Sequence, residues 1–168
     1  MELEYNDWMG LFDLFTTKTE LLPKWNDDKP DWMKEPYMVT KGNRMTVCAT
    51  NGASIIFVDY SLLQHGIYKF PILDKYPKIP TLVPKSKRKT ISGYDVVANV
   101  LDVSDKPYNI NILEGCYLPE FWKPIKAAMF TLGSSELTLL TKPSKTELLL
   151  MQVVDGVRCG IMPFQNNN

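Results

Sequence analysis

The alternation of apolar and polar residues near the N-terminus predicts a helix followed by three β-strands. Asn6 is a suitable helix N-cap, and the residues after it place apolar side chains on one helical face. The apolar residues of this face are Trp8, Met9, Leu11, Phe12, Leu14 and Phe15. Three segments rich in β-forming residues follow, separated by turn sequences. The segments are Tyr37–Thr40, Arg44–Thr50 and Ser54–Tyr60, and the turns are Lys41-Gly42-Asn43 and Asn51-Gly52.

The same order of elements is predicted near the C-terminus. Leu118–Thr131 has the pattern of a helix, and Pro119 suits its first turn. Pro124 leaves two alternatives, a helix that begins near Phe121 or a helix with a kink. The strands expected after it are Glu136–Thr141, Glu147–Val154 and Val157–Pro163, the last two joined by the turn Asp155-Gly156. The two patterns together predict an α+β domain built from two helix-plus-antiparallel-meander repeats.

A proline-rich basic segment, Tyr68–Thr90, separates the two repeats. It contains four prolines, too many for a helix or a central strand, and seven basic residues against one acid. After it, Ile91–Leu101 predicts a strand or a short helix, and Tyr108–Leu113 predicts a strand. We therefore expect one domain, 1–168, with a first repeat at 1–67, an insertion at 68–90 and a second repeat at 91–168.

Charge and composition exclude few classes of protein. Nineteen basic residues balance nineteen acidic ones, so the net charge gives no reason to expect nucleic acid or an anionic membrane as a partner. No apolar run is long enough to span a membrane, and the sequence MELEYND lacks the basic start of a signal peptide. Cys48, Cys116 and Cys159 are few and widely spaced, which indicates buried thiols in a reducing cytoplasm rather than a disulfide or a zinc site.

Catalytic and metal-binding motifs are missing from the sequence. His65 is the only histidine, and there is no nucleophile elbow, phosphate-binding loop or paired-cysteine motif. Asp27, Asp28 and Asp31 form an acidic cluster that indicates either a solvated turn or a weak cation site. We expect a protein that is not an enzyme and that uses no cofactor and no metal.

Three short motifs resemble those of the bacterial DNA sliding clamp, the β subunit of DNA polymerase III. Ala49-Thr50-Asn51-Gly52-Ala53-Ser54-Ile55 is similar to the family's Ala-Thr-Asp-Gly-His-Arg-Leu, and Met162-Pro163-Phe164 to its final Met-Pro-Met. Tyr117-Leu118 matches the Tyr-Leu that opens the family's last helix. The resemblance implies a DNA-clamp-like domain, in which the helices line a ring and the sheets face outward.

The resemblance also implies a binding site for partner peptides. In the family, the glycine loop and the terminal Met-Pro contribute to a pocket that grips clamp-binding peptides. The corresponding residues here are Thr50, Gly52, Ile55, Met162, Pro163 and Phe164. Ala53 and Ser54 replace the family's His and Arg, so two polar contributors to that pocket are missing. Trp25 and Trp32 form either a second partner-binding patch or part of a loop packed on the sheet.

Candidate DNA contacts lie in two places. Lys85, Lys87, Arg88 and Lys89 place four cations within five residues, and Lys123 and Lys126 lie on the second predicted helix. Alternatively, the basic run is a solvated loop that offsets the acidic Met1–Pro36, which holds nine acids and four bases. Asp7 and Asp13 on the first helix oppose a DNA-encircling surface.

Two functional hypotheses follow. The first is a sliding-clamp-like accessory protein or processivity factor, in DNA replication or on a mobile element, whose partners are DNA, replication proteins or clamp-binding peptides. A ring of such single domains would require a homo-oligomer of about six copies. The second is a clamp-fold protein-interaction module that does not bind DNA. A third hypothesis, an enzyme with an unfamiliar site, is disfavoured.

Overall fold

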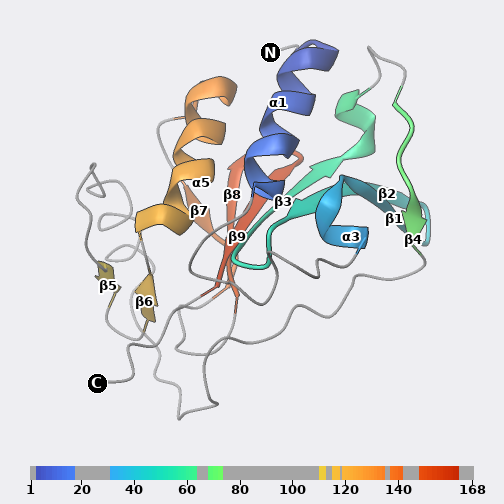
Figure 1. Ribbon diagram of the computed structural model, residues 1–168. Coiled ribbons are helices and arrows are strands. Elements are labelled where there is room, and N and C mark those ends of the chain that lie inside the picture. Colours follow the sequence, from blue (N-terminus) through green and yellow to red (C-terminus); the bar gives the residue numbers. More distant parts are fainter. Residues whose placement is uncertain are drawn as a thin grey trace.

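The computed structural model describes residues 3–17, 31–63, 68–73, 110–112, 115–117, 119–134, 137–141 and 148–162. Its elements form an α+β fold (Figure 1). The predictions for Ile91–Leu101, for the acidic pair Asp27-Asp28, for Lys85–Lys89 and for His65 lie outside these residues.

The first helix, α1, spans Tyr5–Thr16 and begins two residues earlier than predicted. Glu4, not Asn6, is its N-cap, and Asp7 completes a capping box by accepting a hydrogen bond from the Glu4 backbone N–H at 3.0 Å. The buried face consists of Trp8, Leu11, Phe12 and Phe15. Leu14 was predicted on this face but is 40% exposed, so the true stripe is narrower than the apolar pattern indicated.

After the short helix α3, Asp31–Lys34, the chain forms an antiparallel meander. Its strands are β1, Tyr37–Lys41, β2, Arg44–Thr50, and β3, Ser54–Asp59. These bounds agree with the prediction to within a residue. The turns lie where the glycines predict them, since Gly42 and Gly52 have φ values of 62° and 91°. A short 3₁₀ helix, η1, Tyr60–Leu63, ends the unit.

The helix α5 spans Pro119–Leu132 and is likewise followed by an antiparallel meander. The alternative start near Phe121 is wrong, because the helix begins at Pro119 and contains Pro124 in its interior. The strands are β7, Thr138–Leu139, β8, Leu149–Val154, and β9, Val157–Ile161, with Gly156 at a φ of 82° in the predicted turn. Of the strand predicted at Glu136–Thr141, the described residues 137–141 form a strand at Thr138–Leu139 alone.

The two meanders join into one seven-stranded sheet, ordered β4-β1-β2-β3-β9-β8-β7. The central pairing is antiparallel between β3 and β9, with Ser54 opposite Ile161 and Val58 opposite Val157. A strand that the sequence pattern did not predict, β4, Ile72–Leu73, pairs in parallel with β1 at one edge. Of Tyr108–Leu113, the strand β5 contains Ile110–Ile112, and it pairs with β6, Gly115–Tyr117, in a separate two-stranded sheet.

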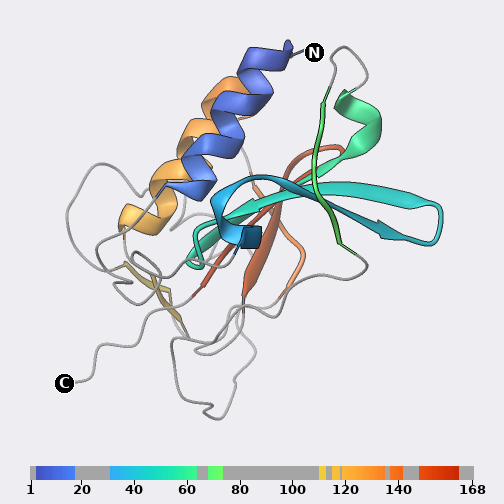
Figure 2. The ribbon, with the colours of Figure 1, turned by 45° about the vertical axis from the view of Figure 1, so that its right-hand side comes forward.

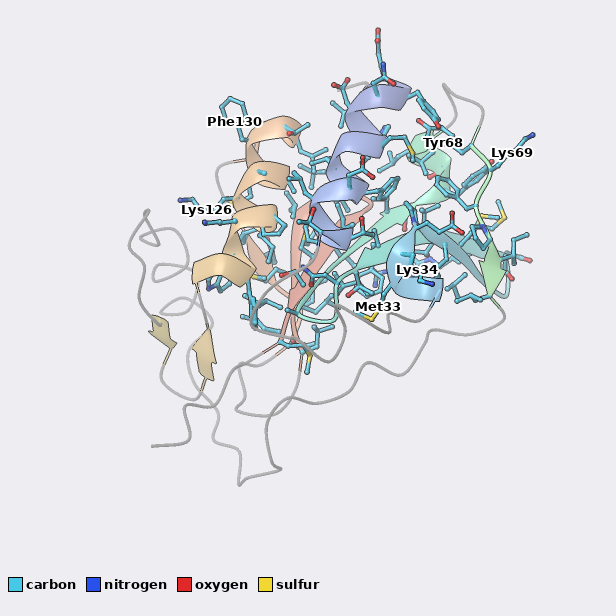
Figure 3. All side chains as sticks on the ribbon, viewed as in Figure 1. Met33, Lys34, Tyr68, Lys69, Lys126 and Phe130 are labelled. Carbon is cyan, nitrogen blue, oxygen red and sulfur yellow. The ribbon has the colours of Figure 1, made fainter. Side chains whose placement is uncertain are left out.

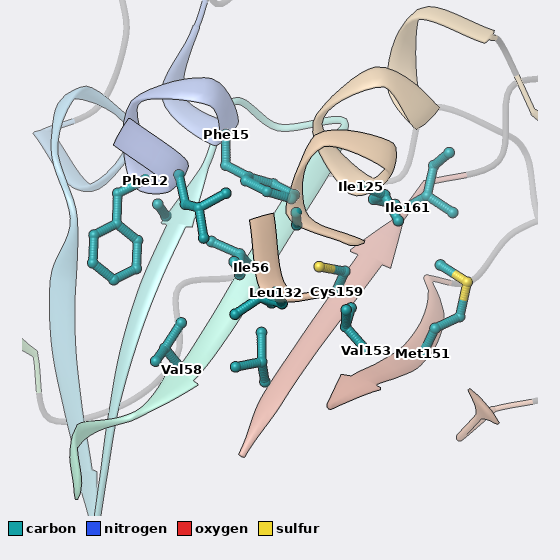
Figure 4. Close-up of a cluster of buried hydrophobic side chains, with 14 of the residues drawn as sticks. Phe12, Phe15, Ile56, Val58, Ile125, Leu132, Met151, Val153, Cys159 and Ile161 are labelled. Carbon is teal, nitrogen blue, oxygen red and sulfur yellow. The ribbon is translucent and has the colours of Figure 1, made fainter. Parts of the chain in front are cut away.

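Both long helices pack side by side on one face of the large sheet and run in opposite directions (Figures 1 and 2). The core lies between this helix layer and the sheet, where α1 contributes Phe12 and Phe15 and α5 contributes Ile125 and Leu132 (Figure 4). Alternate residues of the central strands, such as Ile56 and Cys159, complete it. A second buried cluster of Tyr37, Val39 and Cys48 lies on the opposite face of the sheet.

Candidate functional site: the outer helix face and the Thr50–Ser54 loop

The surface of α1 that faces away from the sheet is acidic. Asp7 and Asp13 are exposed, and the helix contains no basic residue. Gly10 is exposed between them, with no atom within 4 Å of the position that a Cβ would occupy. The outer side of α1 therefore combines negative charge with accessible backbone at its middle.

The corresponding surface of α5 is basic and carries one exposed aromatic ring. Lys123 and Lys126 are exposed, and they are the only charged residues between Phe121 and Leu132. Phe130 is 90% exposed and points away from the sheet in Figure 3. Lys123 and Phe130 are seven residues apart, so both lie on one stripe of the helix, opposite the buried Ile125. We call the exposed sides of α1 and α5 together the outer helix face.

The opposite directions of the helices decide which charges lie near each other. Asp13 is in the last turn of α1 and Lys123 is at the start of the second turn of α5, so both lie towards the same end of the helix layer. Phe130 lies towards the other end of the layer, on the side of α5 turned away from α1 in Figure 3. The outer helix face is thus divided lengthwise into an acidic half and a basic half.

The loop that resembles the clamp motif is an internal junction of the fold. The Thr50 hydroxyl donates to the Ser54 carbonyl at 2.8 Å and accepts from the Gly52 N–H at 3.0 Å. The Asn51 side-chain oxygen accepts from the Ala53 and Ser54 N–H groups, each at 2.9 Å. These bonds fix the loop in a single compact turn.

Three further hydrogen bonds join this loop to distant elements. Asn51 Nδ2 donates to the carbonyl of Thr17, at the end of α1, at 3.1 Å. The Ser54 hydroxyl donates to the Phe121 carbonyl in α5 at 2.7 Å. The Met162 N–H donates to the Ala53 carbonyl at 2.8 Å. The loop therefore connects both helices with the chain just after β9.

The residues predicted to bind a partner peptide are brought together here, but they are buried. Thr50, Gly52, Ile55 and Met162 all have buried side chains or backbone, so they offer almost no surface to a ligand. Their role in peptide binding stays a prediction, and it would require this junction to open. Pro163, Phe164 and Trp25 lie outside the described residues, as does the side chain of Trp32, whose backbone belongs to α3.

Of the predicted DNA contacts, the described residues include Lys123 and Lys126. They lie on the outer helix face, at about the level of the acids of α1, whereas Lys85, Lys87, Arg88 and Lys89 lie outside the described residues. Phe130 and Gly10 were not singled out from the sequence. The sequence does mark them, because each lies on the polar side of a predicted helix, where an aromatic residue or a glycine is uncommon.

The thiols Cys48 and Cys159 are free and buried, as predicted, whereas the side chain of Cys116 lies outside the described residues. Burial raises the pKa of Cys48 from its usual 9.0 to about 12, although a hydrogen bond with Tyr37 and the charge of Arg158 act in the opposite direction. Burial also raises the pKa of Cys159. Neither thiol is suited to act as a nucleophile at neutral pH.

Within the described ranges, no group of three or more His, Cys, Asp or Glu side chains is placed to hold a metal ion. In the same part of the chain, no helix has the length and apolar character needed to cross a bilayer.

Compared with known proteins, the chain matches no family model, no curated protein and no solved structure.

Proposed function

We propose that this chain is a DNA-clamp-type domain and serves as a non-enzymatic accessory protein of DNA replication or of a mobile element. The observation that supports the proposal best is the arrangement of the two helices and the sheet. Two antiparallel helices cover one face of a sheet whose central strands, β3 and β9, join two three-stranded meanders. A sliding clamp has the same order of parts, with its helices facing DNA and its sheets facing outward.

The edges of the sheet favour self-association, which a ring of single-domain chains requires. Ile72 at the β4 edge is 61% exposed, and Leu140, directly after β7 at the other edge, is 43% exposed. Edge strands have unpaired backbone groups that can extend a sheet into a neighbouring molecule. Edge-to-edge contacts would keep the helices of all copies on the same side of a continuous sheet.

A second candidate function is supported by the charges of α1. DNA-encircling proteins hold phosphates with basic side chains, yet Asp7 and Asp13 are exposed on the outer helix face next to the basic α5. These carboxylates favour a clamp-fold interaction module that contacts proteins and does not bind DNA.

DNA binding by the purified protein separates the two functions. We would follow the fluorescence anisotropy of a labelled duplex at about 50 and about 200 mM salt, because each phosphate contact contributes a slope of roughly −0.9 to the salt dependence of affinity. For a clamp-type function, we expect salt-sensitive binding, and Lys123→Gln/Lys126→Gln should reduce the slope by about 2. Lys69→Gln, which changes an exposed lysine outside the outer helix face, is the matched control.

Binding that is unchanged in the double variant would remove the helices from the proposed DNA contact. Absence of binding even at low salt would reject the clamp-type function and leave the interaction module. Light scattering in the same buffers reports whether the chain forms a closed oligomer when DNA is present.

A further inference from the structure

The outward side of α5 has an exposed aromatic ring that the fold does not use. Phe130 is 90% exposed, whereas Phe121, near the start of the same helix, is 1% exposed and packs in the core. Phenylalanine is a poorer helix former than alanine or leucine, so helix stability does not favour it at an exposed position. Between Phe121 and Leu132, no other large apolar side chain of α5 is exposed. The ring therefore lies alone on a polar surface, where a ligand can reach it.

Two cations share the stripe of α5 on which this ring lies. Successive residues of an α-helix are rotated by about 100°, so Lys123, Lys126 and Phe130 fall within a sector of about 60°. At about 1.5 Å per residue, Lys126 lies about 6 Å and Lys123 about 10 Å from Phe130 along the helix axis. Lys126 and Phe130 both point to the side of α5 turned away from α1 (Figure 3). This stripe therefore does not face the acidic residues of α1.

Lys123 is the lysine of the stripe that remains available to a ligand. It is exposed, and no hydrogen bond or ion pair joins it to any residue in the described part of the chain. Lys126 has an interaction within the chain, so it adds positive charge to the stripe without being assigned a ligand. The distance from Lys123 to Phe130 is close to the rise of three stacked nucleotides, at about 3.4 Å each.

The backbone beneath the ring is held in place by the end of the helix. Gly133 has a φ of 68°, and its N–H donates to the Phe130 carbonyl at 3.2 Å. The N–H of Ser134 donates to the Met129 carbonyl at 2.9 Å. The Ser134 hydroxyl donates to the Val153 carbonyl of β8 at 2.9 Å. These bonds fix the last turn of α5 to the sheet, so binding a ligand on Phe130 requires little further ordering of the backbone.

Single-stranded nucleic acid is the ligand class that fits one exposed ring beside a cation. Proteins that bind single strands combine positive charge for the phosphates with aromatic rings on which bases stack. A protein partner fits less well, because a standard interface buries about 800 Å² per side around an apolar centre, and Phe130 has no exposed apolar neighbour on α5. A duplex fits less well, because its bases are stacked inside it and offer no free face to the ring.

We propose that the outward stripe of α5 binds single-stranded nucleic acid, with one base stacked on Phe130 and a phosphate of the same strand held by Lys123. The helix dipole agrees with this arrangement, because it disfavours phosphate at the C-terminal turn, where the uncharged ring lies. Every base has a face that can stack on a phenyl ring, so the site has little sequence preference. It goes beyond the proposed function, which concerns duplex DNA, and does not depend on it.

Binding to a labelled oligo(dT) of about 20 nucleotides, followed by fluorescence anisotropy at about 50 and about 200 mM salt, tests the site. Phe130→Ala should weaken binding at least about fivefold, the effect of losing one stacked base, and should leave the salt dependence unchanged. Lys123→Gln should reduce the slope of the salt dependence by about 0.7, the contribution of one phosphate contact on a single strand. The ring and the cation are thus tested by different readouts.

Further variants separate stacking from a general apolar contact. Phe130→Tyr keeps an aromatic ring and should bind within about twofold of wild type, whereas Phe130→Leu should bind as weakly as Phe130→Ala. Leu14→Ala removes an apolar side chain of α1 that is 40% exposed, and it should leave binding unchanged. These side chains lie on the surface, so circular dichroism should show that every variant is folded.

A strand without bases separates stacking from phosphate binding. An abasic oligonucleotide of the same length has the phosphates of oligo(dT) but nothing to stack on the ring. Wild type and Phe130→Ala should therefore bind it equally, and both should bind it about as weakly as Phe130→Ala binds oligo(dT). A loss caused by Phe130→Ala that is as large on the abasic strand would overturn the stacking of a base.

Equal affinity of wild type and Phe130→Ala for oligo(dT) would overturn the site. Absence of oligo(dT) binding at about 50 mM salt and up to about 100 µM protein would overturn it as well. If the protein binds a duplex but not oligo(dT), the site is rejected and the clamp-type function is unaffected. If it binds oligo(dT) through Phe130 but no duplex, the site is supported and the clamp-type function is rejected.

Discussion

Ser54 and Asn51 connect elements that are far apart in the sequence, although both belong to one short hairpin loop. Ser54 is 1% exposed and donates its hydroxyl proton to the Phe121 carbonyl of α5. Asn51 bonds to two N–H groups of its own loop and to the Thr17 carbonyl. A buried polar group that loses its partner costs about 1–3 kcal/mol, so these side chains stabilise the junction of the two helices.

Removing these side chains should destabilise the fold without exposing a new apolar surface. We expect Ser54→Ala to lower the free energy of unfolding by about 1–2 kcal/mol and Asn51→Ala by about 2–3 kcal/mol. Urea denaturation followed by tryptophan fluorescence measures both. Ser61→Ala, a change of an exposed serine, should stay within about 0.5 kcal/mol of wild type. If Ser54→Ala proves equally neutral, the bond to α5 does not stabilise the fold.

The position of this loop was predictable from Asn51-Gly52, whereas its burial was not. Asn-Gly encodes a turn through local backbone preferences, and the turn formed where expected. The burial of Thr50 and Ile55 depends on contacts with α5 and with the end of β9, which no local pattern contains. For the same reason, the motif that predicts a peptide pocket at these residues did not predict that their side chains are buried.

Buried thiols make the stability of the protein depend on alkaline pH. The pKa of Cys48 rises from 9.0 when exposed to about 12 in the folded chain. Above pH 9 the unfolded chain has lost this proton and the folded chain still holds it, so stability falls as pH rises towards 12. Between pH 9 and 10, wild type should lose roughly 1 kcal/mol more unfolding free energy than Cys48→Ala. Equal pH dependence in urea titrations of the two proteins would show that the Cys48 thiol ionises normally when folded.

At the scale of elements, each long helix is defined by one buried stripe. The stripe of α1 was predicted from spacing, but Leu14 is apolar and still faces solvent. The helices and the hairpins were predictable from the sequence because capping, apolar periodicity and glycine turns act within a few residues. These local patterns did not predict β4 or the pairing of β3 with β9, since both depend on contacts between segments that are distant along the chain.

Two leucines of α1 allow this stripe to be tested by a single type of substitution. Leu11 is 2% exposed and packs in the core, whereas Leu14 is 40% exposed. Leu11→Lys buries an unpaired charge and removes core contacts, so we expect loss of at least about 4 kcal/mol, enough to unfold a marginally stable domain. Leu14→Lys should change stability by less than about 1 kcal/mol. Thermal melts followed by circular dichroism compare them, and two similar melting temperatures would contradict the assignment of the buried face.

For the whole molecule, the β3–β9 pairing has a consequence for how the chain is made. Ser54 and Ile161 are neighbours in the sheet, although they are far apart in the sequence. During synthesis, β1, β2 and β3 leave the ribosome long before β9, so the inner edge of β3 has no partner strand until β9 follows. Such an edge can pair with other nascent chains. The nascent chain is therefore most open to aggregation in the interval between the synthesis of β3 and the synthesis of β9.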